Sequence, residues 1–229
     1  MNASLHFFLF QILPYITLTI LILGSIIRFD RDPYSWRSKS SQFLRKKQLM
    51  WGSVLFHVGV LIVLGGHAVG LLTPIWVFDA MGISHGFKQL MAMSVGGIAG
   101  LCCLVGLLLL LHRRLFDPRI RVTSSFGDIA VLVLLLGQLL LGLASITVSM
   151  HHLDGHEMVK FMEWAQHIVT FRMGASDYLA DVHVIFKLHI VLGMFIFLVF
   201  PFTRLVHIWS APVFYVLRSQ YQIVRRRET

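Results

Sequence analysis

Six histidines of this 229-residue chain lie in or near long apolar stretches, and four of them form a pattern. His57 and His67 begin and end the run "HVGVLIVLGGH", and His189 and His207 begin and end "HIVLGMFIFLVFPFTRLVH". An imidazole in apolar surroundings needs a hydrogen-bond partner or a ligand, because burying an unpaired polar group costs free energy. A structural hydrogen bond explains any one of these histidines alone, but two in each of two apolar stretches favour a binding site.

The composition indicates that these stretches belong to a membrane protein. The chain is 56% hydrophobic and 14% charged, and its mean hydropathy is +0.75, which is untypical of a soluble domain. About 20 helical residues cross the hydrocarbon core of a bilayer. Five apolar stretches without strand-like alternation are long enough, at residues 5–27, 49–72, 90–111, 129–148 and 182–208. The sequence therefore predicts an all-α integral membrane bundle of five transmembrane helices, in a single domain over residues 1–229.

The basic residues predict the orientation of this bundle. Most of the 20 lysines and arginines lie in segments 28–47, 113–121 and 204–227, which fall on one side of the alternating spans. By the positive-inside rule that side is cytoplasmic, so the N terminus lies outside and residues 210–229 form a basic cytoplasmic tail. Anionic lipid and cytoplasmic protein partners together account for the net charge of +9, and nucleic acid is not expected as a partner.

The second and fifth spans run in opposite directions, which brings the histidines to two depths. His57 and His207 fall on the cytoplasmic side, and His67 and His189 fall on the outer side. Two imidazoles that face each other are the axial ligands of a six-coordinate haem. We therefore predict two haem b groups stacked across the membrane, one between each pair of histidines. No Cys-x-x-Cys-His segment is present, so haem of the c type is not encoded.

The spacing of the two pairs differs between the helices. His57 and His67 are 10 residues apart, about 15 Å along a helix, whereas His189 and His207 are 18 residues apart, about 27 Å. A bend at Pro201 is expected to absorb part of the difference. Five glycines near the histidines would let the porphyrins lie close to the backbone, although glycines also serve plain helix packing: Gly59, Gly65, Gly66, Gly70 and Gly193. Arg204, three residues before His207, is expected either to pair with haem propionates or to reach the cytoplasmic headgroups.

The longest connection, residues 149–181, contains an amphipathic stretch. Residues 157–171 place Met158, Phe161, Met162 and Ala165 on one face at helical spacing. We expect this stretch to form a helix on the membrane surface, where it covers a site that opens to the outer leaflet.

The chain resembles a known family, the cytochrome b (gamma) subunit of membrane-bound respiratory nitrate reductase. The resemblance rests on "SWRSKSSQ", "FHVGVLIVLGGHAVGLLTP", "KQLMAMSVGG", "RRLFDPRIR", "WAQHIVTFRMGAS" and "FKLHIVLGMFIFLVFPFTRLVHIWSAPVFY", in this order along nearly the whole sequence. It implies a five-helix dihaem subunit of the bacterial cytoplasmic membrane. Such a subunit oxidises quinol, either menaquinol or ubiquinol, near its outer haem and passes electrons inward. The expected partners are an iron–sulfur (beta) subunit and a molybdenum catalytic (alpha) subunit.

The resemblance also implies roles for individual residues. His57 and His207 would hold the iron of the inner haem, and His67 and His189 that of the outer one. Lys88 corresponds to the lysine of the family's quinol pocket, although an interfacial anchor would also explain it. The preceding loop, "VFDAMGISHGF", differs from the family pattern and places His85 close to Lys88. Either residue is therefore a candidate to hydrogen-bond a quinol oxygen.

Two other functions are consistent with the residues themselves. A transporter also uses intramembrane histidines, but usually with a carboxylate at mid-depth, and here only Asp128 and Asp181 are acidic near span ends. A cytochrome b anchor of another quinone-linked reductase would share the haems and the quinol chemistry and differ in its acceptor. Nitrate itself is not reduced on this chain, which has no cysteine pattern for an iron–sulfur cluster.

Overall fold

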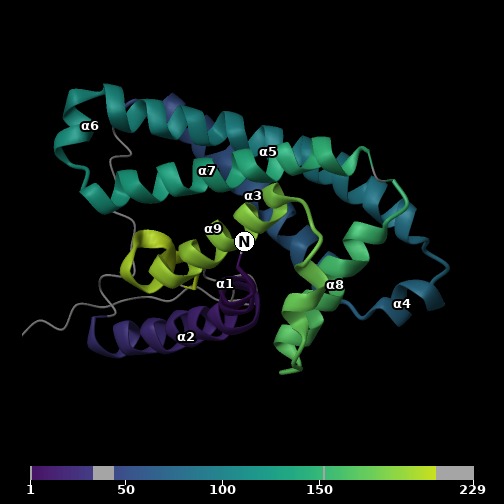
Figure 1. The fold of residues 1–229 in the computed structure, drawn as a ribbon. Coiled ribbons are helices and arrows are strands. Elements are labelled where there is room, and N and C mark those ends of the chain that lie inside the picture. Colours follow the sequence, from purple (N-terminus) through teal and green to yellow (C-terminus); the bar gives the residue numbers. More distant parts are fainter. Residues whose placement is uncertain (1, 33–43, 152, 210–229) are drawn as a thin grey trace, which may run out of the picture.

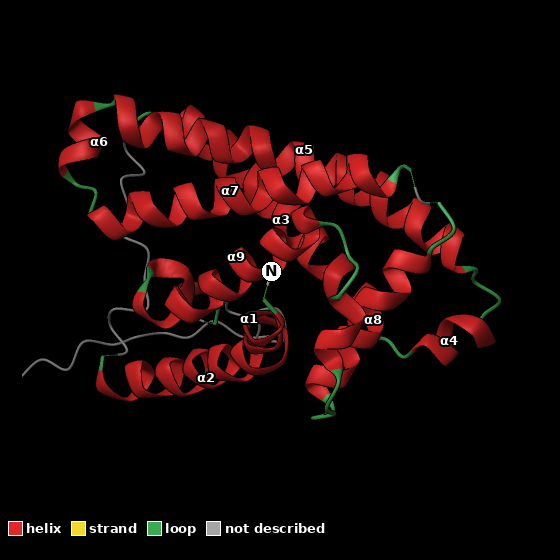
Figure 2. Ribbon diagram, viewed as in Figure 1, coloured by secondary structure: helices red, strands yellow, loops and turns green. Residues whose placement is uncertain are grey.

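Helices make up almost all of the chain that the structure describes. The structure is a computed structural model and describes residues 2–32, 44–151 and 153–209. Figure 2 shows helices joined by short loops. The predicted tail at residues 210–229 and the whole of "SWRSKSSQ" lie outside the described residues.

Five helices of the described chain are long and apolar enough to cross a membrane, as predicted. The first is continuous from Ala3 to Arg31 and consists of α1 (Ala3–Phe7), a π-helical turn η1 (Phe8–Ile12) and α2 (Leu13–Arg31). The next three are α3 (Lys46–Leu72), α5 (His85–Phe116) and α7 (Phe126–Ser149). The fifth covers Val184–Phe202 and consists of α9 (Val184–Val199) and the short helix η4 that follows it. Shorter helices connect or follow them: α4 (Ile75–Ala80), α6 (Pro118–Val122), α8 (His156–Val169), η3 (Ala175–Leu179), η4 (Phe200–Phe202) and η5 (Arg204–Ile208).

The bundle is held together by close contact between α3 and α5. In Figure 1, α5 also runs beside α7, and α9 lies between α7 and α2. A Cβ atom on Gly59 would lie 2.6 Å from the carbonyl oxygen of Ala99, and one on Gly106 would collide with the backbone nitrogen of Phe56. Gly59 therefore serves helix packing, and the prediction that it makes room for a porphyrin is wrong.

A hydrogen bond to the carbonyl oxygen of Phe10 joins the first helix to α8. Pro14 has no N–H to donate to the carbonyl oxygen of Phe10, four residues earlier. Instead, the indole Nε1 of Trp164 in α8 donates to this oxygen at 2.9 Å. The expected amphipathic helix thus forms, as His156–Val169, and it is fixed to the start of the first helix.

The sequence predicts a fifth span over residues 182–208, but in the structure this segment is not one continuous helix. α9 ends at Val199, η4 follows, Thr203 is extended (φ −117°, ψ 179°), and η5 then begins. Pro201 is the physical reason, because its ring and its missing N–H stop an α-helix. Arg28 of α2 donates hydrogen bonds to the freed carbonyl oxygens of Pro201 at 2.6 Å and Thr203 at 2.8 Å.

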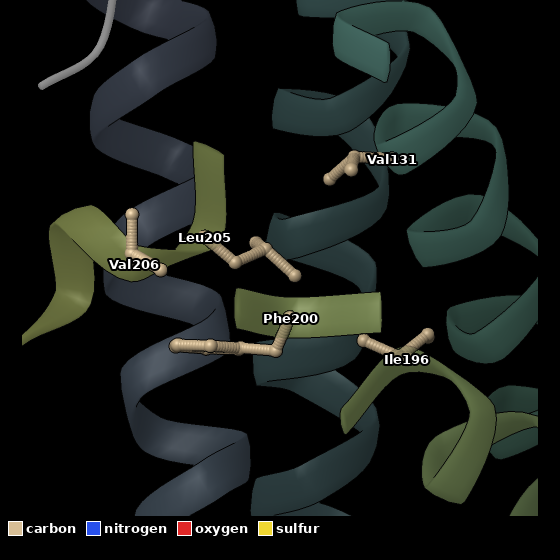
Figure 3. Close-up of a cluster of buried hydrophobic side chains, with 5 residues drawn as sticks. All are labelled: Val131, Ile196, Phe200, Leu205 and Val206. Carbon is tan, nitrogen blue, oxygen red and sulfur yellow. The ribbon is translucent and has the colours of Figure 1, made fainter. Parts of the chain in front are cut away.

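A cluster of buried side chains fixes this broken end against the bundle. Figure 3 shows its members: Val131 of α7, Ile196 of α9, Phe200 of η4, and Leu205 and Val206 of η5. Residues from both sides of the break share this core, so the segment after Val199 stays packed against the bundle. His189 and His207 are therefore not separated by the full rise of an 18-residue helix, and the mismatch expected between α3 and the fifth span does not arise.

Candidate functional site

The four histidines form two facing pairs. The ring centroids of His57 in α3 and His207 in η5 are 6.4 Å apart, with the ring planes at 74°. Those of His67 in α3 and His189 in α9 are 6.1 Å apart, with the planes at 35°. These are the pairs expected from antiparallel spans, and each contains one imidazole from α3 and one from the fifth span.

Each imidazole is oriented by a backbone carbonyl that faces its Nδ1 atom. The distances are 2.7 Å from His57 to Ser53, 2.8 Å from His67 to Val63, 2.6 Å from His207 to Arg204 and 3.1 Å from His189 to Gln138. A carbonyl oxygen only accepts hydrogen bonds, so Nδ1 carries the proton in every ring. The lone pair is then on Nε2, the tautomer that a neutral histidine needs to bind a metal ion through that nitrogen. In His189 this lone pair accepts a hydrogen bond from the side-chain amide of Gln138 at 3.3 Å, which a metal ion would replace.

The spacing within each pair fits a metal ion between two imidazoles. A transition-metal ion bound about 2 Å from each of two opposed ring nitrogens holds the ring centroids roughly 6 Å apart. The surface of α3 beside His67 also has room for a flat group, since a Cβ atom on Gly65, Gly66 or Gly70 would meet nothing within 4 Å. The backbone at Gly193 is already covered by another side chain, because a Cβ atom there would lie 3.1 Å from the amide nitrogen of Gln138.

Gln138 also contacts the ring of His189 and was not foreseen. Its side-chain amide lies 3.3 Å from Nε2 of His189, and its backbone carbonyl accepts from Nδ1. Gly142, one turn further along α7, brings the backbone against the same ring, since a Cβ atom there would lie 3.0 Å from Cε1. Residues of α7 thus position the ring of His189. This contact could not be predicted from the sequence, because Gln138 and His189 are 51 residues apart.

Arg204 forms an ion pair with Asp128, which was not predicted from the sequence. Its guanidinium lies 3.2 Å from Oδ1 of Asp128, and Arg114 lies 3.2 Å from Oδ2 of the same carboxylate. Asp128 is in the first turn of α7, where it forms a capping box with Ser125. That box is visible in the sequence as Ser-x-x-Asp before an apolar run, but its connection to Arg204 is not.

Lys88 and His85 lie on the first turn of α5, where α4 and α8 meet it. Lys88 is only 8% exposed, its ammonium group lies 4.2 Å from the centroid of the Phe78 ring, and it donates to the sulfur of Met162. Nε2 of His85 is 3.7 Å from Oδ1 of Asp79. Lys88 is thus enclosed by α4 and α8 rather than extended toward solvent.

Helix α8 also covers the end of α3. The side-chain amide of Gln166 in α8 donates to the carbonyl oxygens of Leu71 at 3.2 Å and Thr73 at 2.9 Å. The same helix therefore packs over the Lys88 region and over the end of α3 that carries His67.

A helical membrane protein that presents metal-binding nitrogens in two facing histidine pairs has the features of a membrane cytochrome b. The particular family follows from sequence similarity. The chain belongs to the nitrate reductase gamma subunit family, which matches residues 6–227.

Two nitrate reductase gamma chains are similar to this chain over nearly its whole length, and a more distant cytochrome b-like subunit is similar over part of it. The chain is 50% identical to the respiratory nitrate reductase 1 gamma chain of Escherichia coli (strain K12), over 97% of this chain and 98% of that one. It is 44% identical to the nitrate reductase gamma chain of Bacillus subtilis (strain 168), over 96% and 97% of the two chains. An Hdr-like menaquinol oxidoreductase cytochrome b-like subunit of Archaeoglobus fulgidus is 31% identical over 79% of this chain and 60% of its own.

The predicted family is therefore confirmed. As a gamma, cytochrome b, subunit the chain is the quinol-oxidising membrane anchor of a respiratory nitrate reductase. The five apolar helices agree with a place in the membrane. The family also decides against a transporter.

Proposed function

We propose that this chain holds two haem b groups and carries electrons from quinol, across the membrane, to cytoplasmic subunits. In this proposal His57 and His207 hold the inner haem and His67 and His189 the outer haem, with the N terminus outside and the C terminus cytoplasmic. The observation that carries it is the pairing of the four imidazoles at centroid distances of 6.4 and 6.1 Å, each ring with its Nδ1 against a carbonyl.

Bound haem supplies one-electron redox chemistry that no side chain provides. The protein's part is to hold neutral imidazoles in the correct tautomer and orientation. The carbonyls of Ser53, Val63, Gln138 and Arg204 do this, and a hydrogen bond from Nδ1 also makes Nε2 a stronger ligand.

The quinol site is proposed near the outer pair, beneath α8. Lys88 or His85 would hydrogen-bond a quinol oxygen there, and the quinol is menaquinol or ubiquinol. Support comes from the enclosure of Lys88 between Phe78 and Met162, which holds a buried cation at the start of α5. Protons leave on the outside while electrons move inward, which separates charge. Each elementary charge moved through 100 mV stores about 2.3 kcal/mol.

The acceptors are proposed to be an iron–sulfur (beta) subunit and a molybdenum (alpha) subunit on the cytoplasmic side. The basic segments at residues 28–47, 113–121 and 204–227 would contribute to their docking. A second candidate acceptor follows from the likeness to the Archaeoglobus fulgidus subunit, namely that of another quinone-linked reductase. Purifying the complex and identifying its subunits separates the two.

The experiment that tests the proposal is a reduced-minus-oxidised visible spectrum of the purified protein, with haem quantified per chain. We expect two b haems in the natural protein, and the loss of a different one in His57→Ala and in His189→Ala. Absence of haem from a folded, helical preparation would refute the proposal.

A further inference from the structure

The end of α7 that faces η5 carries a buried carboxylate between two guanidinium groups. Asp128 is 9% exposed, and its two oxygens each lie 3.2 Å from an arginine, Oδ1 from Arg204 and Oδ2 from Arg114. The three residues come from α7, η5 and α5. One carboxylate therefore joins the broken end of the fifth span to two long helices.

The position of this carboxylate is fixed by the start of α7. The backbone N–H of Ser125 donates to Oδ2 of Asp128 at 3.1 Å, and the hydroxyl of Ser125 accepts from the backbone N–H of Asp128 at 3.3 Å. Arg114 is held as well, because it also donates to the hydroxyl of Ser124 at 3.0 Å. Asp128 thus presents Oδ1 to Arg204 from a rigid base.

Arg204 in turn carries the group that orients His207. Nδ1 of His207 donates to the backbone carbonyl of Arg204 at 2.6 Å, within the five-residue 3₁₀ helix η5. A 3₁₀ helix of this length has little stability of its own, because its hydrogen bonds have poor geometry. The orientation of the His207 ring therefore depends on contacts that fix Arg204 from outside η5.

We propose that Asp128 is a positioning residue for His207. By holding Arg204, it sets the direction of the Arg204 carbonyl and hence the plane of the imidazole that faces His57. This inference rests on the proposed function, in which His57 and His207 hold the inner haem. In this inference Arg204 forms an ion pair inside the protein, and the ion pair orients the imidazole of His207.

The test compares Asp128→Asn with a matched control in haem-loaded protein. Asp117→Asn is the control, because Asp117 also caps a helix, α6, and pairs with an arginine at 2.7 Å, but this arginine is Arg45 and not Arg204. The readouts are haem per chain and the low-spin EPR spectrum, which depends on the angle between the two imidazole planes of each haem. The outer haem in the same molecule reports that the variant is folded.

We expect Asp128→Asn to change the EPR signal of the inner haem and to weaken haem retention there by about tenfold, as loss of a group behind a ligand typically does. The outer haem and Asp117→Asn should match the natural protein. An unchanged inner signal in Asp128→Asn would overturn the proposal while leaving the two-haem function intact.

Two further results complete the test. If Asp128→Asn does not fold, Asp128→Glu replaces it, since it keeps the charge and moves the oxygens outward by one methylene. A shifted inner signal in that variant supports the proposal, and an unchanged one overturns it. Absence of haem from the natural protein would refute the proposed function, and this inference with it.

Discussion

The guanidinium group of Arg28 donates a hydrogen bond to the carbonyl oxygen of Pro201 at 2.6 Å, across 173 residues of sequence. The same nitrogen also donates to the carbonyl oxygen of Thr203 at 2.8 Å. Both acceptors lie just after Val199, where the fifth span stops being α-helical. Gly24 makes the approach possible, because a Cβ atom there would lie 2.9 Å from Cβ of Pro201.

Replacing Arg28 by Ala should destabilise the segment that carries His207. Each buried carbonyl left without a donor costs about 1–3 kcal/mol, so we expect a lower unfolding free energy in detergent and weaker haem retention at the inner pair. Arg31→Ala removes an exposed arginine of the same helix and is the control. Equal stability of the two variants would show that these hydrogen bonds do not support the break.

Replacing Gly142 by Ala should disturb only the outer pair. The new Cβ atom would lie 3.0 Å from Cε1 of His189, so the ring must move by a few tenths of an ångström. We expect an altered EPR signal from the outer haem and an unaltered one from the inner haem. Gly137→Ala on the same helix is the control, since its Cβ atom meets Leu192 at 3.4 Å, an ordinary contact.

Replacing Gly106 by Ala should separate α3 from α5. The added methyl group collides with the backbone of Phe56, which has no flexible atom to move aside. Overpacking of this kind costs about 1–3 kcal/mol, measurable as a lower unfolding free energy. Gly96→Ala on α5 is the control, because its Cβ atom would meet nothing within 4 Å. A stable Gly106→Ala protein would contradict the observed helix separation.

Replacing Lys88 by Ala should slow the reduction of haem by quinol without changing haem content. Loss of a hydrogen bond from a charged donor is expected to lower the rate constant by about tenfold or more. Stopped-flow reduction by a quinol analogue measures it. Lys160→Ala is the control, because Lys160 pairs with Glu157 on α8 at 3.0 Å. If both variants are reduced at the natural rate, Lys88 is an interfacial anchor.

The pairing of the histidines could be predicted from the sequence, because depth in a membrane follows from position along a span. The partners of Nδ1 were partly predictable. His57 and His67 use the carbonyl four residues earlier, which every helix offers. The partner of His189 is Gln138, on another helix, and no local pattern points to it.

The errors have a common physical cause. Glycine spacing indicates that something approaches the backbone closely, but it does not say what. At Gly59 the neighbour is α5, whereas at Gly66 the surface is open. Pro201 was expected to bend a helix and instead ends it. Arg28 stabilises the break, because it donates hydrogen bonds to the carbonyl oxygens that the helix leaves unpaired. Such compensation comes from distant residues, as does the contact between Asp128 and Arg204.

The link between α2 and the break at Pro201 also limits the order of biogenesis. Arg28 is translated long before its acceptors, so these hydrogen bonds form only after the last span has been synthesised and has met the first helix. The segment that carries His207 therefore reaches its final position only after the whole fifth span has met Arg28. A cofactor held between His57 and His207 would therefore be loaded after the fifth span is in the membrane, and not while the chain is still emerging.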